Sequence, residues 1–548
     1  MRRRTRYDPI TLGVHWSRLV AIVDEASATL VRTAFSRIVT DAWDFTCALF
    51  DEDGQMIAQP TQGLPSFIGS VATAVGHFRR AFPPETLAPG DTLVTNDPWI
   101  GTSQLNDMVF VSPIFHRRRI VGYAANISHS PDVGGRLLSA DARELFEEGL
   151  RLPISKLIVR GRPNETIFNI IRANVRVPDI VVGDLLAQEA ANRTMIRRVV
   201  ELLEKEGLRD LRTLSREVLG RSEAAMRQAV ARIPDGTYES RVETDGFDAP
   251  LEIRARVTVR DDEMAVDFAG TSPQQELGIN CTFNYTYAET VFPLICIAGP
   301  ETPINAGTLR PLRVTAPDGT ILSAMHPAPL GGRLLVSMYV QCAVFRALAQ
   351  AVPGRVLADC AAPAWTPVVQ GIDQHGRRFV DIVFLNGGLG ARPNKDGASV
   401  LGFPAPLGGT LVEIFENEKP MLVERRELAE DTAGAGRHRG GAGLHFVLRS
   451  EAPGPITVGL RGDRLEHPAQ GLFGGRAAAP GIMQWNGKPQ HPKRTIILRS
   501  GDVLTFRTPG GGGYGDPAER PRAGVREDVE AGLLSAERAR ADYGFATG

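Results

Sequence analysis

The sequence predicts an α+β protein of several domains, with a mixed N-terminal half, a helical middle segment and a mainly β C-terminal part. At 548 residues the chain is too long for one hydrophobic core. Apolar residues recur at helical spacing near the start and in the middle, and they alternate with polar residues further on. We expect an N-terminal α+β region over 1–139, a helical region over 140–236, an α+β region with a β-hairpin over 237–355, and a mainly β, glycine-rich region over 356–548.

The first two regions are defined by changes in the spacing of apolar residues. A long amphipathic helix is expected over 12–34, and short strands from there to about residue 128, with turn signals at Asp53-Gly54 and Pro89-Gly90. Two apolar faces in the helical region predict one helix that ends at Gly207 and a second that Pro234 terminates.

The second half changes to strand patterns. Alternating residues over 251–259 and 264–268 flank Arg260-Asp261-Asp262 and predict a hairpin. A helix is expected from about Leu335 to Ala351, and short strands between glycine-rich turns follow Val356. A last amphipathic helix near 526–543 would dock on the body or on a partner.

The glycine-rich stretches 434–443 and 510–515 do not have the spacing of a phosphate-binding loop. Neither stretch follows a clear strand and opens a helix, as phosphate binding at a helix N-terminus requires. We therefore expect tight β-turns there and no nucleotide site on this chain.

Composition excludes several classes of protein. The net charge of −1 gives no reason to expect nucleic acid or an anionic membrane as partner. No apolar stretch is long enough to predict a membrane span, and the basic run over 2–6 is not followed by the apolar segment of a secretion signal. The five cysteines are scattered without Cys-x-x-Cys spacing, so we expect reduced thiols in a cytoplasmic protein.

Polar residues gather around one predicted hairpin, whose strands are the apolar stretches 108–115 and 120–128. If the hairpin is centred near Arg117, Asp107 pairs roughly with Ile127, and His129 projects from the same open end. Gln104 in the preceding loop adds an amide to this carboxylate and imidazole.

The segment after the hairpin continues the polar cluster. Asp132 precedes Gly134 and Gly135, where backbone could approach a ligand closely, and Arg136 follows. A purely structural interpretation stands beside the functional one, because strand ends and turns are rich in Asn, Asp and Gly. A single histidine at a strand end is also more often a hydrogen-bonded structural residue than a ligand.

Short motifs rich in Asp, Asn, Gly and Pro occur from one end of the chain to the other. The motifs are Asp8-Pro9-Ile10-Thr11-Leu12, residues 44–51, Asn96-Asp97-Pro98, Asp132-Val133-Gly134-Gly135, residues 148–153, Asn174-Val175-Arg176, Ala191-Asn192-Arg193, residues 267–274, residues 305–312, Gly390-Ala391-Arg392-Pro393 and residues 508–517. In this order they resemble one known family, the hydantoinase/oxoprolinase B subunits. The family comprises ATP-dependent cyclic-amide hydrolases and is related to the large subunits of acetone and acetophenone carboxylases.

The resemblance implies a divalent metal, zinc or manganese, on an early aspartate, a His-x-x-Asp loop and a later histidine. Carried over, the ligands are Asp44, Gln104, Asp107 and His129, so Gln104 stands where a histidine is expected. An amide oxygen is a poorer ligand than imidazole for zinc or manganese. A harder or more weakly bound metal, a metal held by the other three residues, and a lost metal all stay open.

The resemblance also implies a reaction and a partner. An A-type subunit with an actin-like ATP site would phosphorylate the cyclic amide, and this chain would add metal-bound water, with Asp132 or Glu148 as general base. The complex would be a hetero-oligomer that binds ATP on the partner. The alternatives are a component of an ATP-dependent ketone carboxylase and a non-catalytic scaffold with a degenerate metal site.

Overall fold

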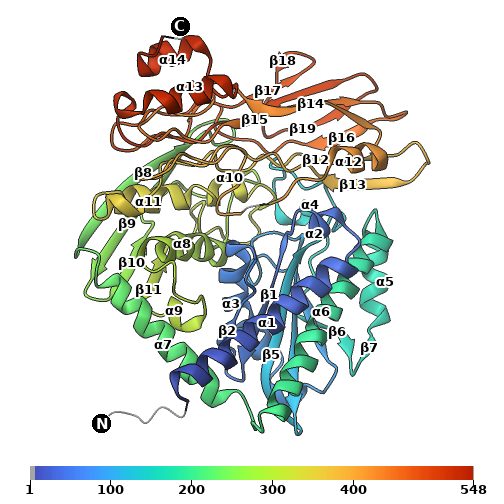
Figure 1. Cartoon of the computed structure of the whole chain (residues 1–548). Coiled ribbons are helices and arrows are strands. Elements are labelled where there is room, and N and C mark those ends of the chain that lie inside the picture. The colour runs from blue at the N-terminus through green and yellow to red at the C-terminus, as the bar shows by residue number, and fades with distance from the viewer. Residues whose placement is uncertain (1–6, 406, 547–548) are drawn as a thin grey trace.

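The computed structural model describes residues 7–405 and 407–546, which form four β-sheets with helices around them (Figure 1). The basic run over 2–6 lies outside the described residues. Two small C-terminal sheets lie together at one end of the molecule, above the N-terminal sheet and a second α/β unit. An α+β, multi-domain architecture is confirmed.

The N-terminal sheet has seven antiparallel strands in the order β2-β1-β5-β4-β3-β6-β7. Its strands are β1 (Phe45–Asp51), β2 (Met56–Ala58), β3 (Thr92–Thr95), β4 (Asp107–His116), β5 (Arg119–His129), β6 (Ser155–Val159) and β7 (Arg162–Pro163). Around it lie α1 (Pro9–Thr33), α2 (Arg37–Thr40), α3 (Pro65–Ala81), α4 (Leu145–Glu148), α5 (Glu165–Asn174), α6 (Pro178–Lys205) and α7 (Arg212–Val230).

Both faces of this sheet are buried, which β1 shows residue by residue. Phe45, Cys47 and Leu49 pack with α1 and α6, whereas Ala48 and Phe50 pack with α3 on the other face. A strand covered on both sides is apolar throughout instead of alternating. Packing on both faces therefore holds β1 in place, and with it the residues at the end of the strand.

Two predictions for this part are wrong. The segment expected to hold only short strands contains α3, whose apolar residues from Phe67 to Phe78 recur at helical spacing after Pro65 at the helix start. The segment expected to be helical from residue 140 begins with β6 and β7, which extend the first sheet beyond the predicted boundary at 139. The long first helix is confirmed as α1, capped by the Asp8 side chain.

The second sheet has the order β11-β10-β9-β8. The predicted hairpin is confirmed, with Arg260 opposite Glu263 across its turn. The predicted helix over 335–351 is interrupted and forms two pieces, α10 and α11. The elements of this unit are β8 (Gly236–Thr244), β9 (Leu251–Arg260), β10 (Glu263–Asp267), α8 (Phe283–Ala298), α9 (Ala306–Leu309), β11 (Leu312–Thr315), α10 (Leu334–Ser337) and α11 (Val340–Ala349).

The C-terminal part is mainly β, as expected, and its two sheets have the orders β13-β12-β16-β19 and β14-β15-β20-β17-β18. The single helix predicted at the end is two helices, because Gly532 takes a left-handed backbone (φ 69°) and Ser535 caps the second. The elements are β12 (Val368–Ile372), β13 (Arg378–Ile382), α12 (Val412–Glu418), β14 (Met421–Ala429), β15 (Gly443–Ser450), β16 (Ile456–Gly459), β17 (Ile482–Trp485), β18 (Lys488–Pro489), β19 (Thr495–Leu498), β20 (Val503–Arg507), α13 (Arg522–Glu530) and α14 (Ala536–Tyr543).

The glycine-rich stretches 434–443 and 510–515 are not the tight turns that the sequence predicts. They are largely extended segments that hydrogen-bond to one another, as Gly434 N does to Gly511 O at 2.9 Å. A Cβ on Gly511 would lie 2.1 Å from the Leu389 carbonyl oxygen, so glycine is required by close backbone packing and not by a left-handed φ.

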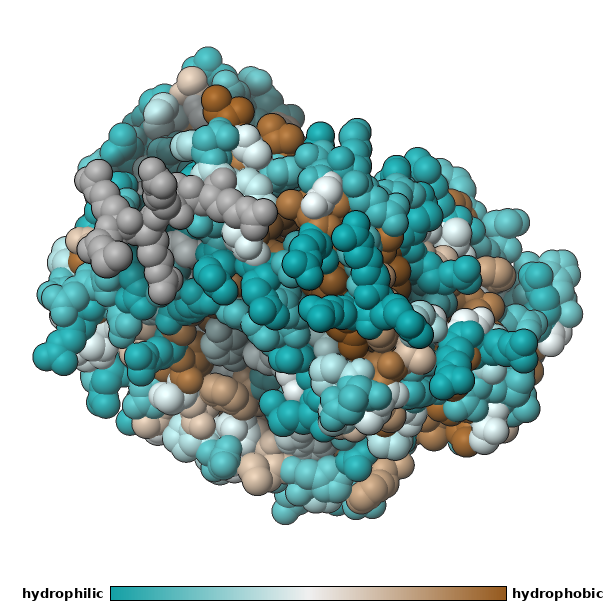
Figure 2. Space-filling model, turned by 90° about the horizontal axis from the view of Figure 1, so that it is seen from below, coloured by the Kyte–Doolittle hydropathy of each residue, from teal (hydrophilic) through white to brown (hydrophobic). Residues whose placement is uncertain are grey.

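The outer surface seen in Figure 2 is mainly hydrophilic with scattered small hydrophobic areas, as on other folded proteins. Within the described ranges, no helix combines the length and the apolar character needed to cross a membrane. All five cysteines are free thiols.

Candidate active site at one end of the first sheet

Three polar residues of the predicted site lie at one end of three neighbouring strands. Asp44 immediately precedes β1, His129 ends β5 and Asp107 begins β4. Because β5 lies between β1 and β4, these residues are neighbours, and the His129 N–H donates to the Asp44 carbonyl at 3.1 Å. The predicted convergence at the open end of the hairpin is confirmed.

The pairing within the hairpin differs from the predicted one by two residues. Asp107 lies opposite His129, not Ile127. The tip is the pair Arg117-Arg118, both with positive φ, and Val121 is an extra residue that shifts the register between Ile114 and Phe115. The shift brings the carboxylate and the imidazole into direct contact.

Asp107 is the centre of the polar network. Its Oδ1 lies 2.7 Å from His129 Nδ1, while Oδ2 accepts from the Arg333 guanidinium and the Thr102 hydroxyl. Burial opposes ionisation, but Arg333 and then His129 outweigh it and lower the pKa of Asp107 to about 2. Asp107 is therefore a carboxylate at neutral pH, and its two oxygens are already engaged.

Asp44 is in a different state from Asp107. Its Oδ2 lies 3.9 Å from His129 Nδ1, and its side chain accepts no hydrogen bond from any described residue. Burial raises the pKa of Asp44 to about 6, because the lowering effect of His129 is smaller. The two carboxylates therefore differ strongly in proton affinity although both are near one imidazole.

Gln104 faces the same cavity, but its amide is used to hold another segment. Its Nε2 donates to the Gly331 carbonyl at 2.9 Å. Arg461 Nη1 donates to the same carbonyl at 3.1 Å. A Cβ on Gly331 would lie 2.3 Å from the Ser139 carbonyl oxygen, so only glycine allows this segment to approach so closely.

Arg333 and Arg461 belong to the site and were not predicted from the sequence. Arg333 precedes α10, and Arg461 follows β16 in the C-terminal part. Both are almost fully buried, with 3% of each residue exposed. No motif marks either residue, and each lies more than two hundred positions from Asp107, so only the tertiary structure identifies them.

The residues enclose a cavity of about 30 Å³, which has room for roughly two water molecules. One end is polar and the remaining wall is apolar. The polar lining is Asp44, Ser66, Gln104, His129, Tyr285, Arg333, Thr366 and Arg461, and the apolar lining includes Leu64, Phe67, Leu334, Met338, Ile382, Phe384, Ala405 and Leu407. An apolar wall with a few convergent polar groups is the kind of lining found in small-molecule sites, but this cavity is much smaller than the roughly 300 Å³ or more of such sites.

The backbone next to two of these residues has an uncommon conformation. Trp43, just before Asp44, has a φ of 61°, and Ser103, just before Gln104, has a φ of 67°. Non-glycine residues rarely adopt this left-handed region, and such residues cluster at functional sites.

Asp132 and Glu148, the predicted general bases, do not line the cavity. Asp132 accepts from Arg176 at 2.7 Å and from the Gly134 N–H at 3.0 Å, so it anchors the loop after β5. In that loop Gly134 approaches the Asn174 carbonyl and not an open space.

Glu148 lies outside the cavity and holds a backbone segment that borders it. It accepts from the backbone N–H groups of Leu330 and Gly331, each at 2.7 Å. Burial raises the pKa of Glu148 to about 7, although these two hydrogen bonds lower it. Glu148 therefore positions the segment whose carbonyl binds Gln104 and Arg461.

These residues do not fit the divalent metal that the family resemblance implies. Within residues 7–405 and 407–546, no three His, Cys, Asp or Glu side chains are close enough together to hold a metal ion. Asp107, the central ligand of the predicted set, already binds a guanidinium, a hydroxyl and an imidazole. The cation of this site is an arginine of the chain itself.

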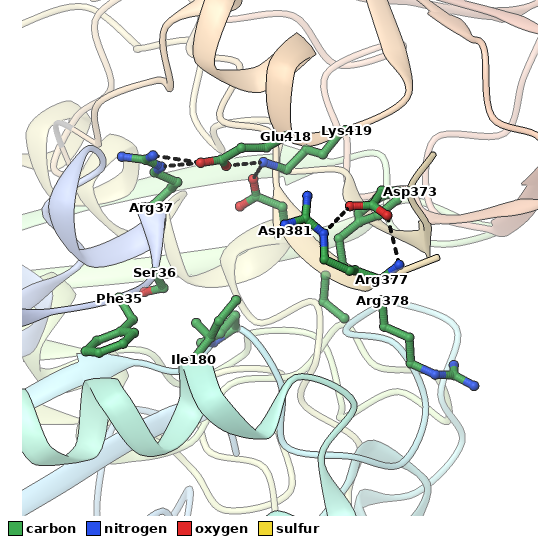
Figure 3. A pocket seen from close by; sticks show the side chains of 13 residues that line it. Phe35, Ser36, Arg37, Ile180, Asp373, Arg377, Arg378, Asp381, Glu418 and Lys419 are labelled. Carbon is green, nitrogen blue, oxygen red and sulfur yellow. Dashed lines mark hydrogen bonds and ion pairs between the residues drawn. The ribbon is translucent and has the colours of Figure 1, made fainter. Parts of the chain in front are cut away.

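A larger cavity of about 280 Å³ lies between α2, the loop after β5 and β13 (Figure 3). Its buried Lys419 binds Asp381 at 2.6 Å and Glu418 at 3.1 Å. Glu418 also binds Arg37 at 2.6 Å. These charges are balanced within the protein, so they give no indication of a ligand.

Comparison with known proteins identifies the family of this chain. The family described as Hydantoinase B/oxoprolinase matches residues 8–517. The chain is 32% identical to the beta chain of the caprolactamase of Pseudomonas jessenii, over 98% of this chain and 96% of that one. It is 30% identical to the B-type component of a putative D-/L-hydantoinase of a Pseudomonas species, over 98% and 95% of the two chains.

Solved structures show the same relationship. The ATP-dependent caprolactamase of Pseudomonas jessenii superposes with a TM-score of 0.91 and 29% identity, over 99% of this chain and 97% of that one. An acetone carboxylase superposes with a TM-score of 0.90 over 98% and 79%, but at 19% identity it shows only a shared fold. The chain belongs to the Hydantoinase B/oxoprolinase family.

Proposed function

We propose that this chain is the B-type component of an ATP-dependent cyclic-amide hydrolase and acts on an intermediate that a separate A-type subunit phosphorylates. The observation that carries the proposal is the end-to-end similarity to the beta chain of the caprolactamase, an enzyme described as ATP-dependent. The hydantoinase relative is likewise named as one component of a larger enzyme.

The proposed reaction has two chemical steps, phosphorylation of the amide and addition of water, which two different subunits would carry out. A cyclic amide is stabilised by resonance, and phosphorylation of its carbonyl oxygen creates a better electrophile. After water adds to the carbon, the C–N bond would break and the ring nitrogen would take a proton, and hydrolysis of the resulting acyl phosphate would release phosphate. The glycine-rich segments of this chain pack against backbone and are not phosphate loops, so ATP would bind to the partner. The polar end of the cavity would face the activated carbon and its apolar wall would lie beside the ring, and the cavity, which has room for roughly two water molecules, would have to widen to admit that ring.

His129 is the residue best placed to activate water. Its Nδ1 is held by Asp107, and its Nε2 has no hydrogen-bond partner among the described residues. An imidazole that donates through one nitrogen to a carboxylate can take a proton through the other. His129 would remove a proton from water as the oxygen attacks the activated carbon.

The test is ring opening and phosphate release by this chain with and without its A-type partner, with caprolactam, hydantoin and 5-oxoproline as substrates. We expect turnover only from the complex, and His129→Ala should slow ring opening by about a hundredfold or more. A parallel reaction with acetone and bicarbonate tests the carboxylase alternative. ATP hydrolysis by the isolated chain would contradict the proposed division of labour.

A second candidate is a non-catalytic role in which the chain supports its partner. Gln104 in place of a histidine and the engagement of Asp107 by Arg333 favour this role. It predicts that the complex assembles and turns over equally well with His129→Ala. Unchanged turnover in that variant would establish the scaffold role and reject catalysis at this cavity.

A further inference from the structure

Arg461 is a buried cation without a carboxylate partner. Its Nε donates to the Thr366 carbonyl and its Nη1 to the Gly331 carbonyl, both at 3.1 Å. No described carboxylate lies within ion-pair distance of the guanidinium, and Nη2 makes no hydrogen bond to a described residue. Burial of an unpaired charge is costly, so this arrangement indicates an anion supplied from outside the chain.

Arg333 adds a second guanidinium to the same cavity. Its Nη1 is bound to Asp107, and its planar group lies over the Tyr285 ring at 4.3 Å, which fixes its orientation. Its Nε has no hydrogen-bond partner among the described residues. Burial, and after it the charge of Arg333, lower the pKa of Arg461 to about 9, whereas Asp107 outweighs burial and raises the pKa of Arg333. Both guanidinium groups are therefore charged at neutral pH.

The carboxylates of the cavity do not form an ion pair with Arg461. Asp107 is shared between Arg333 and His129, while Asp44 lies beyond ion-pair distance of Arg461. Arg461 is thus the guanidinium group at the polar end of the cavity that has no carboxylate bound to it within the described residues.

We propose that Arg333 and Arg461 form a binding site for a small oxyanion, a phosphoryl or carboxylate group, in the place where the family resemblance implies a divalent metal. Guanidinium groups bind both kinds of oxyanion through parallel N–H donors. The size of the cavity admits the anionic group alone and not a large ligand. Which oxyanion is the physiological one depends on the proposed function, but the existence of the site does not.

The experiment measures binding of inorganic phosphate and of acetate to the full-length chain without a partner, by calorimetry. Saturable binding of either anion is expected, and the stronger of the two identifies the phosphoryl or the carboxylate group as the preferred ligand. Arg461→Gln should weaken binding by about tenfold or more, as expected for loss of one charge-assisted contact. Arg494→Gln, which removes an exposed arginine outside the cavity, is the matched control and should bind as the wild type does.

Two further variants test the planar donor geometry of Arg461 and the nearby negative charge of Asp44 separately. Arg461→Lys preserves the charge but loses the planar donor pair, so it should bind better than Arg461→Gln and less well than the wild type. Asp44→Asn removes a nearby carboxylate and should strengthen anion binding. Failure of both anions to bind the wild type, or equal binding by Arg461→Gln, would overturn the proposal even if the complex hydrolyses cyclic amides.

Discussion

Two cavities of this molecule differ in how their buried positive charge is compensated. In the larger one, Lys419 is 4% exposed and lies between Asp381 and Glu418, so the cation is compensated (Figure 3). In the smaller one, Arg461 is similarly buried and has only carbonyl oxygens as partners. We infer that Lys419 stabilises the fold, whereas Arg461 is available to bind a ligand.

The surrounding elements explain the contrast. Lys419 and Asp381 come from neighbouring parts of the C-terminal region, which can form an ion pair without any ligand. Arg461 instead enters from the C-terminal part towards the end of the N-terminal sheet, where Asp107 is already bound by Arg333. The larger volume of the first cavity does not mark it as a binding site, whereas the unpaired charge of Arg461 favours the smaller one.

The largest expected effect comes from breaking the compensated pair. Lys419→Met leaves Asp381 buried without its partner and should lower the free energy of unfolding by about 3–5 kcal/mol. Urea unfolding followed by tryptophan fluorescence measures the change. Glu418→Gln, which alters a half-exposed carboxylate, is the control and should cost much less. A loss below about 1 kcal/mol for Lys419→Met would show that this pair is not what stabilises the larger cavity.

The stability of the fold is expected to depend on pH through Glu289, which lies next to the cavity that Arg333 and Arg461 line. Glu289 is buried beside Tyr285 and accepts from Ser66 at 2.5 Å, while its Oε2 has no partner among the described residues. Burial raises the pKa of Glu289 from 4.5 to about 7. The unfolded chain therefore loses this proton at lower pH than the folded protein, and stability falls as the pH rises from about 4.5 to about 7.

Glu289→Gln removes this titration. The variant should be more stable than the wild type above about pH 7, by up to about 3 kcal/mol, and the gain should vanish near pH 4. Thermal unfolding across that range, with the exposed Glu85→Gln as control, measures the difference. A gain that is the same at both ends of the range would mean that the ionisation of Glu289 is not its cause.

Arg461→Met should change stability far less than Lys419→Met. The substitution loses two hydrogen bonds to carbonyl groups, which costs stability, but it also removes a buried unpaired charge, which is favourable. The net change in the free energy of unfolding should stay within about 1–2 kcal/mol in the absence of added anion. A loss as large as that of Lys419→Met would show that Arg461 has a compensating partner in the folded chain.

The sequence predicted much of the fold and the meeting of Asp107 and His129 at one end of a hairpin, for reasons that particular residues show. Helix α1 and the β9–β10 hairpin carry their apolar spacing locally, and the β4–β5 hairpin placed Asp107 and His129 at one end. The exact register depended on Val121, an extra residue that no local pattern marks. Helix α3 was not predicted although its spacing is helical, and the packed glycine segments look like turns in sequence because glycine serves both purposes.

The predicted ligands and bases depended on contacts between distant segments. Asp107 looked available because Arg333, which occupies it, comes from a segment without any motif. Asp132 and Glu148 are ionisable residues of conspicuous motifs, yet one anchors a loop and the other holds the backbone of Gly331. Local sequence identifies residues that can do chemistry, but tertiary contacts decide which of them are free to do it.

The smallest expected effect concerns zinc content: Gln104→His alone should leave the amount of bound zinc unchanged. Gln104→His supplies the imidazole that the family resemblance implies, and imidazole is a better zinc ligand than an amide. Asp107 nevertheless stays bound to Arg333, Thr102 and His129, so the substitution alone should retain no more zinc than the wild type after dialysis. Gln104→His combined with Arg333→Met frees the carboxylate and should retain about one zinc ion, as a four-ligand site does. Adding His129→Ala to that double variant should abolish the zinc again, which controls for binding elsewhere. Zinc in the single variant would mean that Arg333 yields its place to a metal, and the cation at this site would then be interchangeable instead of built into the chain.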